Sequence, residues 1–376
     1  MKNPFIYGEA VLGENFADRK KELHELVRDL SDSERIFLIS PRRYGKTSLI
    51  MNALKVLKLK GTYTVYIDLY KATSLHKLLE IYVREITSAV ETKFERMLDF
   101  FKKTLPGLRP KITVDPDGTT SIGIEYTDSK EDTFRFLDRI FDLPQKLAEE
   151  KKRNFVVVFD EFQEIREFNG EAIEKAMRAS IQHHDKVAYL FSGSKRHLLY
   201  DMVANRNRAF YMMGRVINLE KIPRAEFMDF ILDIFQKTDF SVENGSIEKV
   251  LDLVEDFPYN AQFFCHKLWD DFYDTKSIKL SEIEPILNQI ITENTPVFLS
   301  IWDDLSLVQR RLLEAIVHAG SKEFLTEESI KKYDLANISI AQTALKSLME
   351  KQILDRENDV YWFTDVFFKE WIRRKI

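Results

Sequence analysis

One stretch of the sequence constrains the fold more than any other, because it predicts a buried strand, a short loop and a helix in direct succession. Residues 36–39 are apolar, residues 40–47 form the loop Ser-Pro-Arg-Arg-Tyr-Gly-Lys-Thr, and residues 48–57 have the spacing of an amphipathic helix. A loop that ends in Gly-Lys-Thr at the start of a helix is typical of phosphate binding, since backbone N–H groups and the helix N-terminus attract anions. The segment therefore predicts a phosphate site beside Lys46.

The residues of this loop have distinct expected roles. The ammonium group of Lys46 would reach the β- and γ-phosphates, and the hydroxyl of Thr47 would bind Mg²⁺. Ser40 stands where this motif usually has its first glycine, and serine resists backbone conformations that glycine permits, so we expect the position to affect loop geometry and affinity. The residues expected to hold the nucleotide here are Ser40, Pro41, Arg42, Arg43, Tyr44, Gly45, Lys46, Thr47 and Ser48.

A second motif is an apolar strand that ends in two acidic residues. Residues 155–159 are Phe-Val-Val-Val-Phe, and Asp160 and Glu161 follow directly. Ligands bind at the carboxyl ends of strands in open α/β sheets, so this pair is expected to face the phosphate loop. Asp160 would hold Mg²⁺, directly or through water, and Glu161 would orient and polarise an attacking water. The alternative is a strand that ends in a solvated turn; Lys46 and Thr47 upstream weigh against it.

The first 220 residues alternate short β-branched or aromatic runs with helical patterns, which indicates a parallel sheet with helices on both faces. Five strands are expected, at residues 35–39, 64–68, 155–159, 187–191 and 215–219. Residues 111–114 and 121–126 flank Asp-Pro-Asp-Gly, a strong turn signal, and so predict a hairpin insertion at about 106–128. The fold class is therefore α/β, of the P-loop NTPase type, over residues 1–220.

Two further domains are expected after the sheet. A helical domain would occupy residues 221–300, with its clearest break at 239–245. Residues 301–376 read as three helices and two short strands, the pattern of a winged helix. Ser339 and Gln342 have the spacing of a capping box that opens a helix to about residue 351, and residues 353–356 and 360–363 would form the wing.

Charge and composition limit the classes of partner. Lys plus Arg number 56 and Asp plus Glu number 61, so the net charge is −5 and the chain as a whole is no polycation. Residues 301–376 carry 12 basic and 13 acidic residues, and the expected recognition helix offers only Lys346 and Lys351 as cations, so DNA binding is open but not favoured over docking. A single cysteine and the lack of a long apolar stretch favour a cytoplasmic protein away from membranes.

Taken together, the motifs resemble the archaeal-type P-loop ATPases, within the STAND class of AAA-related NTPases, and the resemblance covers nearly the whole chain. The segments that carry it are Asn-Pro-Phe at 3–5, Phe-Ala-Asp-Arg at 16–19, Pro-Arg-Arg-Tyr-Gly-Lys-Thr-Ser-Leu at 41–49, Val-Val-Phe-Asp-Glu-Phe-Gln at 157–163, Phe-Ser-Gly-Ser at 191–194, Gly-Arg at 214–215, Phe-Pro-Tyr at 257–259 and Phe-Thr-Asp at 363–365.

The resemblance implies roles that spacing alone does not show. Phe16 and Arg19 would border the adenine, and Pro258 resembles the proline of the GxP element, with Asp256 at its glycine position. Pro258 has the alternative of simply ending a helix.

Two further roles also come only from the resemblance. Ser192 or Ser194 would read the γ-phosphate, and Arg215 would approach the phosphates in cis or across a subunit contact. The alternatives are an ordinary turn after the strand for the two serines and a solvated charge at a strand edge for Arg215.

The implied function is an ATP-binding protein, a Mg²⁺-dependent ATPase that acts as a nucleotide-controlled conformational switch with ATP and ADP as its two ligands. The implied partners are nucleotide and, in the ATP state, a protein or a second copy of the chain. One alternative is a DNA-binding regulator or mobile-element accessory protein whose affinity depends on ATP. Another is a nucleotide-binding scaffold with little turnover.

Overall fold

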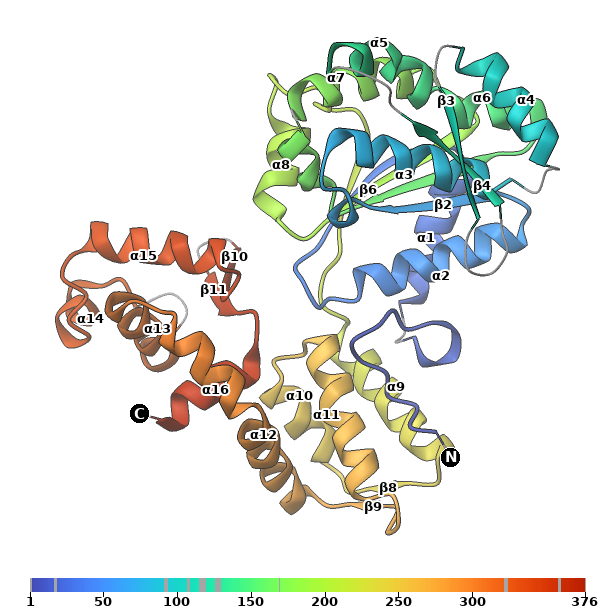
Figure 1. Ribbon diagram of the computed structural model, residues 1–376. Coiled ribbons are helices and arrows are strands. Elements are labelled where there is room, and N and C mark those ends of the chain that lie inside the picture. The colour runs from blue at the N-terminus through green and yellow to red at the C-terminus, as the bar shows by residue number, and fades with distance from the viewer. Residues whose placement is uncertain are drawn as a thin grey trace. The chain divides into compact units, whose positions relative to one another are not determined.

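The computed structural model describes residues 2–16, 19–90, 94–106, 109–114, 120–125, 130–168, 170–320, 324–357 and 360–375 (Figure 1). The chain divides into two compact units. The sheet unit consists of residues 19–41 and 46–220, and the helical unit consists of residues 1–18, 42–45 and 221–376. Four residues of the phosphate loop thus group with the helical unit, although the residues on either side of them belong to the sheet unit.

The sheet unit contains the parallel five-stranded sheet that the sequence predicts. Its strands, in the order β2-β5-β6-β1-β7, are β2 Tyr63–Asp68, β5 Phe155–Asp160, β6 Val187–Gly193, β1 Arg35–Ile39 and β7 Arg215–Asn218. Every neighbouring pair is parallel. The carboxyl ends of the strands therefore meet at one edge of the sheet.

Helices flank this sheet, which explains why its central strands are continuously apolar. All six residues of β5 and all seven of β6 are buried. In Figure 1, α2 (Lys46–Leu59) and α3 (Leu75–Ser88) lie on opposite sides of β2. The other helices of the unit are α1 Lys20–Ser31, α6 Leu143–Lys151, η3 Phe162–Phe168, α7 Gly170–Ile181 and α8 Arg196–Ala204, with the short η2 Leu69–Lys71 after β2.

The expected hairpin is present between α4 (Phe94–Thr104) and α5 (Lys130–Phe141). Strands β3 (Arg109–Val114) and β4 (Thr120–Glu125) pair antiparallel, with Ile112 opposite Ile122. The expected turn at 115–118 lies outside the described residues. Ile122 is buried in the core of the sheet unit, so the hairpin is packed onto the domain.

The helical unit begins with a series of helices interrupted by one very short sheet. Its elements are η1 Gly13–Asn15, α9 Arg224–Lys237, β8 Ser241–Val242, α10 Ser246–Leu253, α11 Pro258–Asp271, β9 Ser277–Ile278, η4 Leu280–Glu282 and α12 Ile283–Asp303. The expected break at 239–245 contains β8, which pairs parallel with β9. Two-residue strands give no periodic signal, so the sequence does not reveal this pairing.

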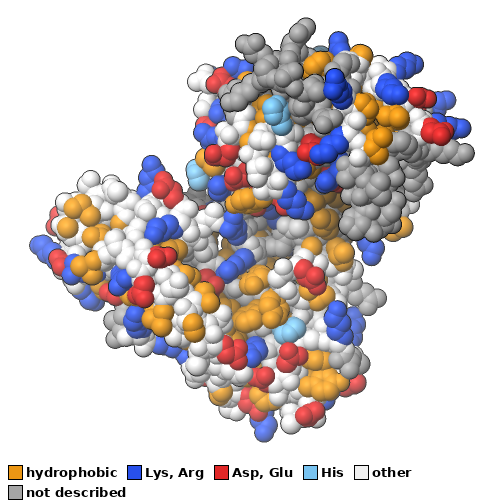
Figure 2. Space-filling view, viewed as in Figure 1, with side chains coloured by type: hydrophobic (Ala, Val, Ile, Leu, Met, Phe, Trp, Pro, Cys, Tyr) orange, Lys and Arg blue, Asp and Glu red, His pale blue; other side chains and the backbone are white. Residues whose placement is uncertain are grey.

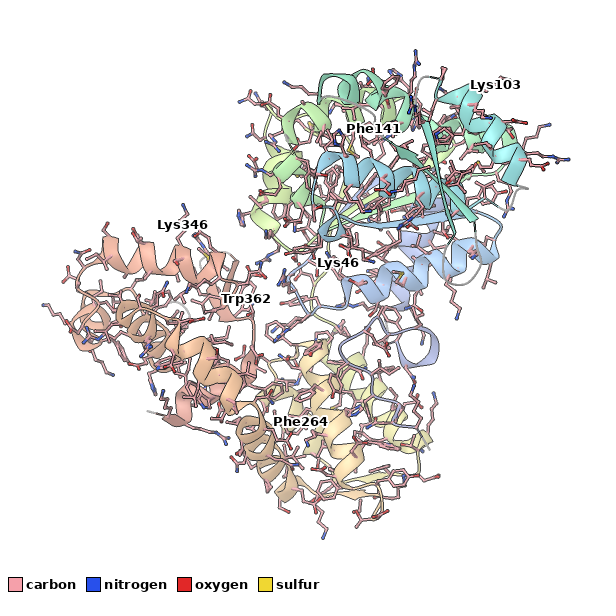
Figure 3. All side chains as sticks on the ribbon, viewed as in Figure 1. Lys46, Lys103, Phe141, Phe264, Lys346 and Trp362 are labelled. Carbon is pink, nitrogen blue, oxygen red and sulfur yellow. The ribbon has the colours of Figure 1, made fainter. Side chains whose placement is uncertain are left out.

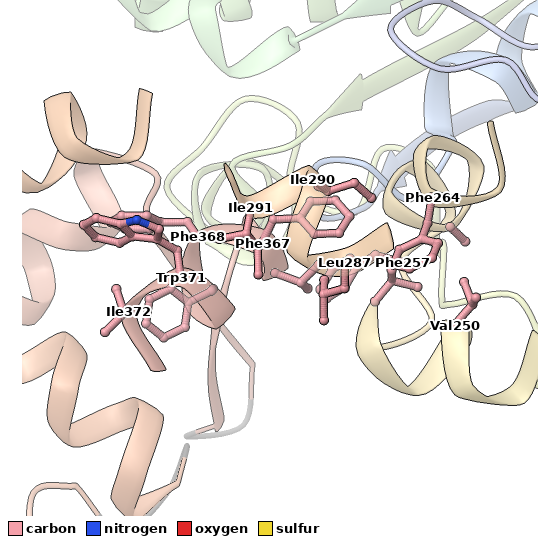
Figure 4. Packing of buried hydrophobic residues seen from close by; sticks show 14 of the residues in the cluster. Val250, Phe257, Phe264, Leu287, Ile290, Ile291, Phe367, Phe368, Trp371 and Ile372 are labelled. Atoms are coloured by element: carbon pink, nitrogen blue, oxygen red, sulfur yellow. The ribbon is translucent and has the colours of Figure 1, made fainter. Parts of the chain in front are cut away.

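The winged helix is confirmed, and it ends in a helix that the sequence analysis missed. Its elements are α13 Leu307–Ala319, α14 Glu327–Lys332, α15 Ile338–Glu350, β10 Leu354–Glu357, β11 Val360–Phe363 and α16 Val366–Lys375. Buried side chains of α16, among them Phe367 and Trp371, share one core with residues of α10, α11 and α12 (Figure 4). The boundary expected after residue 300 falls inside α12, so a continuous helix joins the two regions.

Among the described residues, no helix is both long and apolar enough to cross a membrane.

The N-terminus of α15 differs from the sequence prediction. The residue before the helix is Asn337, whose backbone is extended at φ −157° and whose side chain accepts a hydrogen bond from the Ile340 N–H at 2.9 Å. The capping box expected at Ser339 and Gln342 is therefore wrong, because Ser339 already lies inside the first turn. An N-cap needs a non-helical backbone, and Asn337 provides it.

We expect Asn337→Ala to lower the free energy of unfolding by about 1 kcal/mol, because an N–H of the first turn loses its acceptor. Ser339→Ala is the matched control and should change the free energy by less than about 0.5 kcal/mol. Urea denaturation of the full chain measures both. An equal or larger loss for the Ser339 variant would show that the serine is the cap after all.

Candidate functional site

The structure brings the two sequence motifs together at the carboxyl edge of the parallel sheet. Lys46 begins α2 (Figure 3), and Asp160 and Glu161 stand at the end of β5. The Lys46 Nζ lies 2.8 Å from Asp160 Oδ1 and 3.4 Å from Glu161 Oε1. The lysine side chain is 8% exposed and the acidic side chains 7% and 16%, so water screens these charges only weakly.

Asp160 is held as an anion by four hydrogen bonds. Its Oδ1 accepts from Lys46, from the Ser192 hydroxyl and from the Glu161 N–H, and its Oδ2 accepts from the Tyr66 hydroxyl at 2.6 Å. Burial alone would raise the pKa of Asp160, but the charge of Lys46 and the side-chain donors outweigh it and place the pKa below its ordinary value. The carboxylate therefore offers hard, negatively charged oxygens at neutral pH.

Glu161 stands on a strained backbone with its carboxylate held from several sides. Its φ is +50°, in the left-handed region that non-glycine residues rarely occupy. Oε2 accepts from the Gln163 amide at 2.6 Å and from the Ser194 hydroxyl at 2.9 Å, while Oε1 faces Lys46. Burial would raise the pKa of Glu161, yet Lys46 and the Gln163 hydrogen bond bring it below its ordinary value. An anionic carboxylate of this kind can accept a proton.

Two residues of this cluster were not assigned roles from the sequence. Tyr66 lies on β2, beside β5, and both burial and the negative charge of Asp160 raise the pKa of its phenol, so it remains a donor. The sequence gives little indication of this role, because Tyr66 is one of several aromatic or β-branched residues in a strand whose side chains alternate between buried and half-buried. Gln163 had a clearer signal, since it follows the acidic pair by two residues and belongs to a segment that carries the family resemblance.

The phosphate loop accommodates Ser40 without needing a glycine there. Its left-handed backbone positions are Arg43 at φ 67° and Gly45 at φ 83°, and Ser40 has no positive φ. Ser40 is fully buried, and its hydroxyl donates to the Pro41 carbonyl at 2.8 Å. The expected effect of the serine on loop geometry is therefore not seen, because the loop makes its left-handed turns at other residues.

The loop residues that group with the helical unit make specific contacts inside it. Arg43 Nη1 donates to the Thr364 carbonyl at 2.9 Å and to Asp365 Oδ2 at 3.1 Å, and its guanidinium lies 5.0 Å from the centre of the Tyr259 ring. The Tyr44 ring packs edge-on against Phe257, with the ring centres 5.6 Å apart. Pro258, the next residue, is the first residue of α11 and is buried.

The two residues expected near the adenine lie in different units. Arg19 is 2% exposed in the sheet unit, where it donates to the Glu220 carbonyl at 2.8 Å and pairs with Glu22 at 3.0 Å. Phe16 follows the short helix η1 in the helical unit. These contacts give Arg19 a structural role, because they join the first residue of the sheet unit to its last residue, Glu220.

Arg215 does not join the cluster. It is the first residue of β7, level with Ile36 of β1, and so lies at the amino edge of the sheet, while Lys46 and Asp160 lie at the carboxyl edge. Its guanidinium forms ion pairs with Asp29 and Glu25 of α1. The expectation that Arg215 approaches the phosphates is not met within the chain. Arg215 starts β7, and the length of that strand separates it from the carboxyl edge, where Lys46 and Asp160 lie.

The donor set fits a magnesium–triphosphate group. Lys46 supplies a cation for phosphate oxygens, and the Thr47 hydroxyl and Asp160 carboxylate are the oxygen ligands that Mg²⁺ prefers. Within the described part of the chain, no cluster of three or more His, Cys, Asp or Glu could hold a metal on its own.

Comparison with known proteins agrees with this geometry. The family described as an ATPase domain predominantly from Archaea matches residues 16–260, and a probable winged helix domain matches residues 296–374. The chain therefore belongs to this family of ATPase domains and carries a C-terminal winged helix. No curated protein shows a significant match to the chain.

Several solved structures share the fold over the whole length. The Walker-type ATPase PABY2304 of Pyrococcus abyssi is 18% identical with a TM-score of 0.67, covering 98% of this chain and 99% of that one. The ORC2 protein of Aeropyrum pernix, solved in ADPNP–ADP complexes, is 13% identical with a TM-score of 0.58 and coverage of 100% and 98%. The ORC1 protein of the same organism, solved with DNA, is 10% identical with a TM-score of 0.52 and coverage of 97% and 94%. At these identities the likeness concerns the fold.

Proposed function

We propose that this protein binds ATP with Mg²⁺ and hydrolyses it to ADP and phosphate. The observation that carries the proposal is the buried cluster in which Lys46 contacts both Asp160 and Glu161 at the carboxyl edge of the sheet. Membership of an ATPase family and the nucleotide complexes of the ORC2 protein support the same function.

Each residue of the cluster has a part in the proposed reaction. Lys46 would donate to the β- and γ-phosphates, and Thr47 and Asp160 would hold Mg²⁺, which would supply positive charge against the charge on the phosphates. Glu161 accepts a proton from the water whose oxygen attacks the γ-phosphorus, and the bond from that phosphorus to the bridging oxygen of ADP breaks. The donors on Asp160 and Glu161, including Ser192 and Ser194, keep both carboxylates anionic for these roles.

Lys46→Ala should abolish nucleotide binding, and Glu161→Gln should keep it while lowering kcat at least about 100-fold, because the proton acceptor is lost. Calorimetric titration with ADP and a phosphate-release assay measure the two effects. Lys55→Ala, an exposed lysine on the same helix, is the control and should behave like the parent. Parental turnover in the Glu161 variant would refute the catalytic assignment.

We propose further that nucleotide state controls the conformation of the protein, as a switch of the STAND type. The support is the loop itself: residues 42–45 are bonded within the helical unit, and the next residue is Lys46. A backbone change that moves Lys46 with its ligand also acts on Arg43 and its partners Thr364 and Asp365. A ligand shifts such an equilibrium only through different affinities for the two states, so the coupling is measurable as an affinity ratio.

Asp365→Asn tests this coupling, because asparagine can still cap α16 through the bonds that Asp365 Oδ1 accepts from Phe367 and Phe368, while its charge for Arg43 is lost. The ratio of affinities for ADP and a non-hydrolysable ATP analogue should change about two- to fivefold, as expected for a half-exposed ion pair. Glu293→Gln, which breaks the separate pair with Lys267, should leave the ratio unchanged. An unchanged ratio in the Asp365 variant would count against the loop as the coupling element.

Light scattering of the parent protein with ADP and with the ATP analogue shows whether a second copy of the chain binds in either nucleotide state.

A DNA-binding regulator is the second candidate, because winged helices read DNA and the ORC1 protein was solved with DNA. The described charges do not favour it. On α15, Lys346 points away from the domain (Figure 3) but lies 3.9 Å from Glu350. Lys351, directly after the helix, donates to the Asp304 carbonyl. The exposed C-terminal cations Arg373 and Arg374 pair with Glu370, and Lys375 lies over the Trp302 ring. Over the winged helix, the face in Figure 2 shows basic and acidic side chains interspersed.

We therefore expect no mobility shift with duplex DNA at about 50 mM salt, where electrostatic association is strong, in either nucleotide state. A shift that weakens steeply with added salt in one nucleotide state would instead establish the regulator.

A further inference from the structure

Gln163 is a buried side chain whose shortest hydrogen bond among the described residues is to the proposed catalytic carboxylate. It lies on η3, is 2% exposed, and its Nε2 donates to Glu161 Oε2 at 2.6 Å. A second, longer contact of 3.4 Å joins the same nitrogen to Glu164 Oε1. Among the described residues, the Gln163 Oε1 is a buried oxygen without a hydrogen-bond partner.

The chemistry of the contact fixes the orientation of the amide. An ionised carboxylate only accepts hydrogen bonds, so the amide nitrogen must face Glu161 and the amide oxygen must face the other way. The opposite orientation would place two acceptors 2.6 Å apart. An unpaired buried amide oxygen costs free energy. The chain accepts this cost and keeps a donor on Glu161, which points to a function for that donor.

The unpaired oxygen lies against Gly193, the last residue of β6. A Cβ at this position would lie 2.1 Å from Gln163 Oε1 and 2.8 Å from Leu199 Cδ1. Gly193 has no positive φ, so the backbone conformation does not require glycine there. The requirement is space, which the Gln163 amide and, less closely, the Leu199 side chain occupy.

We propose that Gln163 is a positioning residue that holds the Glu161 carboxylate in place, and that Gly193 is a glycine in order to leave room for it. This inference rests on the proposed ATPase function. Glu161 is drawn toward Lys46 through Oε1 and toward Gln163 and Ser194 through Oε2. Without the Gln163 amide, the carboxylate loses its shortest bond and follows the lysine, away from the orientation it needs to accept a proton from water.

Kinetics of two independent variants test the proposal. Gln163→Met keeps the length of the side chain without a donor, and Gly193→Ala displaces the amide from the other side. Both should lower kcat about 10- to 100-fold while the dissociation constant for ADP stays within about threefold, because orientation is lost and binding is not. Gln145→Met removes a glutamine that bonds Asp185 near the amino edge of β6 and should leave kcat unchanged. Parental kcat in Gln163→Met overturns the proposal.

A readout without turnover separates this inference from the proposed function. If the parent protein does not hydrolyse ATP, the function fails, but the contact can still be tested by a double-mutant cycle in thermal unfolding. Gln163→Met should lower the Tm of the parent and have little effect in a Glu161→Ala background. An equal loss of Tm in both backgrounds shows that Gln163 does not act through Glu161, and the inference is then wrong whatever the ATPase assay gives.

Discussion

The structure depends on one buried arrangement of charge, in which Lys46 lies between Asp160 and Glu161. Removing three charges from water is strongly unfavourable, and their mutual attraction offsets this only with good geometry and further donors. Tyr66, Ser192, Gln163 and Ser194 supply those donors. The parallel sheet makes the arrangement feasible, since the ends of β1, β5 and β6 bring distant parts of the chain to one edge.

The elements that the sequence predicts best are those with a strong local signal. The strands of the sheet carry apolar runs, and the hairpin is marked by Asp-Pro-Asp-Gly, so both are found where expected. The N-cap of α15 was misplaced because Asn337 and Ser339 are both good caps, and only the backbone decides between them. Helix α16 was missed although its buried residues Phe368, Trp371 and Ile372 have helical spacing, because so short a segment gives less than three turns of periodic signal.

The site shows the same division between local and distant information. Lys46 and the acidic pair stand in recognisable motifs. Tyr66 reaches Asp160 only because β2 is the neighbour of β5 in the sheet, which no local motif indicates. Arg215 illustrates the reverse, since the expected strand at 215–219 already began at this residue, yet the family resemblance assigned it to the phosphates. Ser40 shows that a motif position can change when the required backbone angles fall on its neighbours Arg43 and Gly45.

Helix α12 has a mechanical consequence for the C-terminal part of the chain. Its 21 residues form a rod roughly 30 Å long, residues 304–306 connect it to α13, and α16 returns to pack on it, so the winged helix is attached to the rod twice. Pro296, inside the rod, has no N–H to donate to the carbonyl one turn earlier. The missing hydrogen bond weakens the rod locally, so within α12 the helix bends most easily at Pro296.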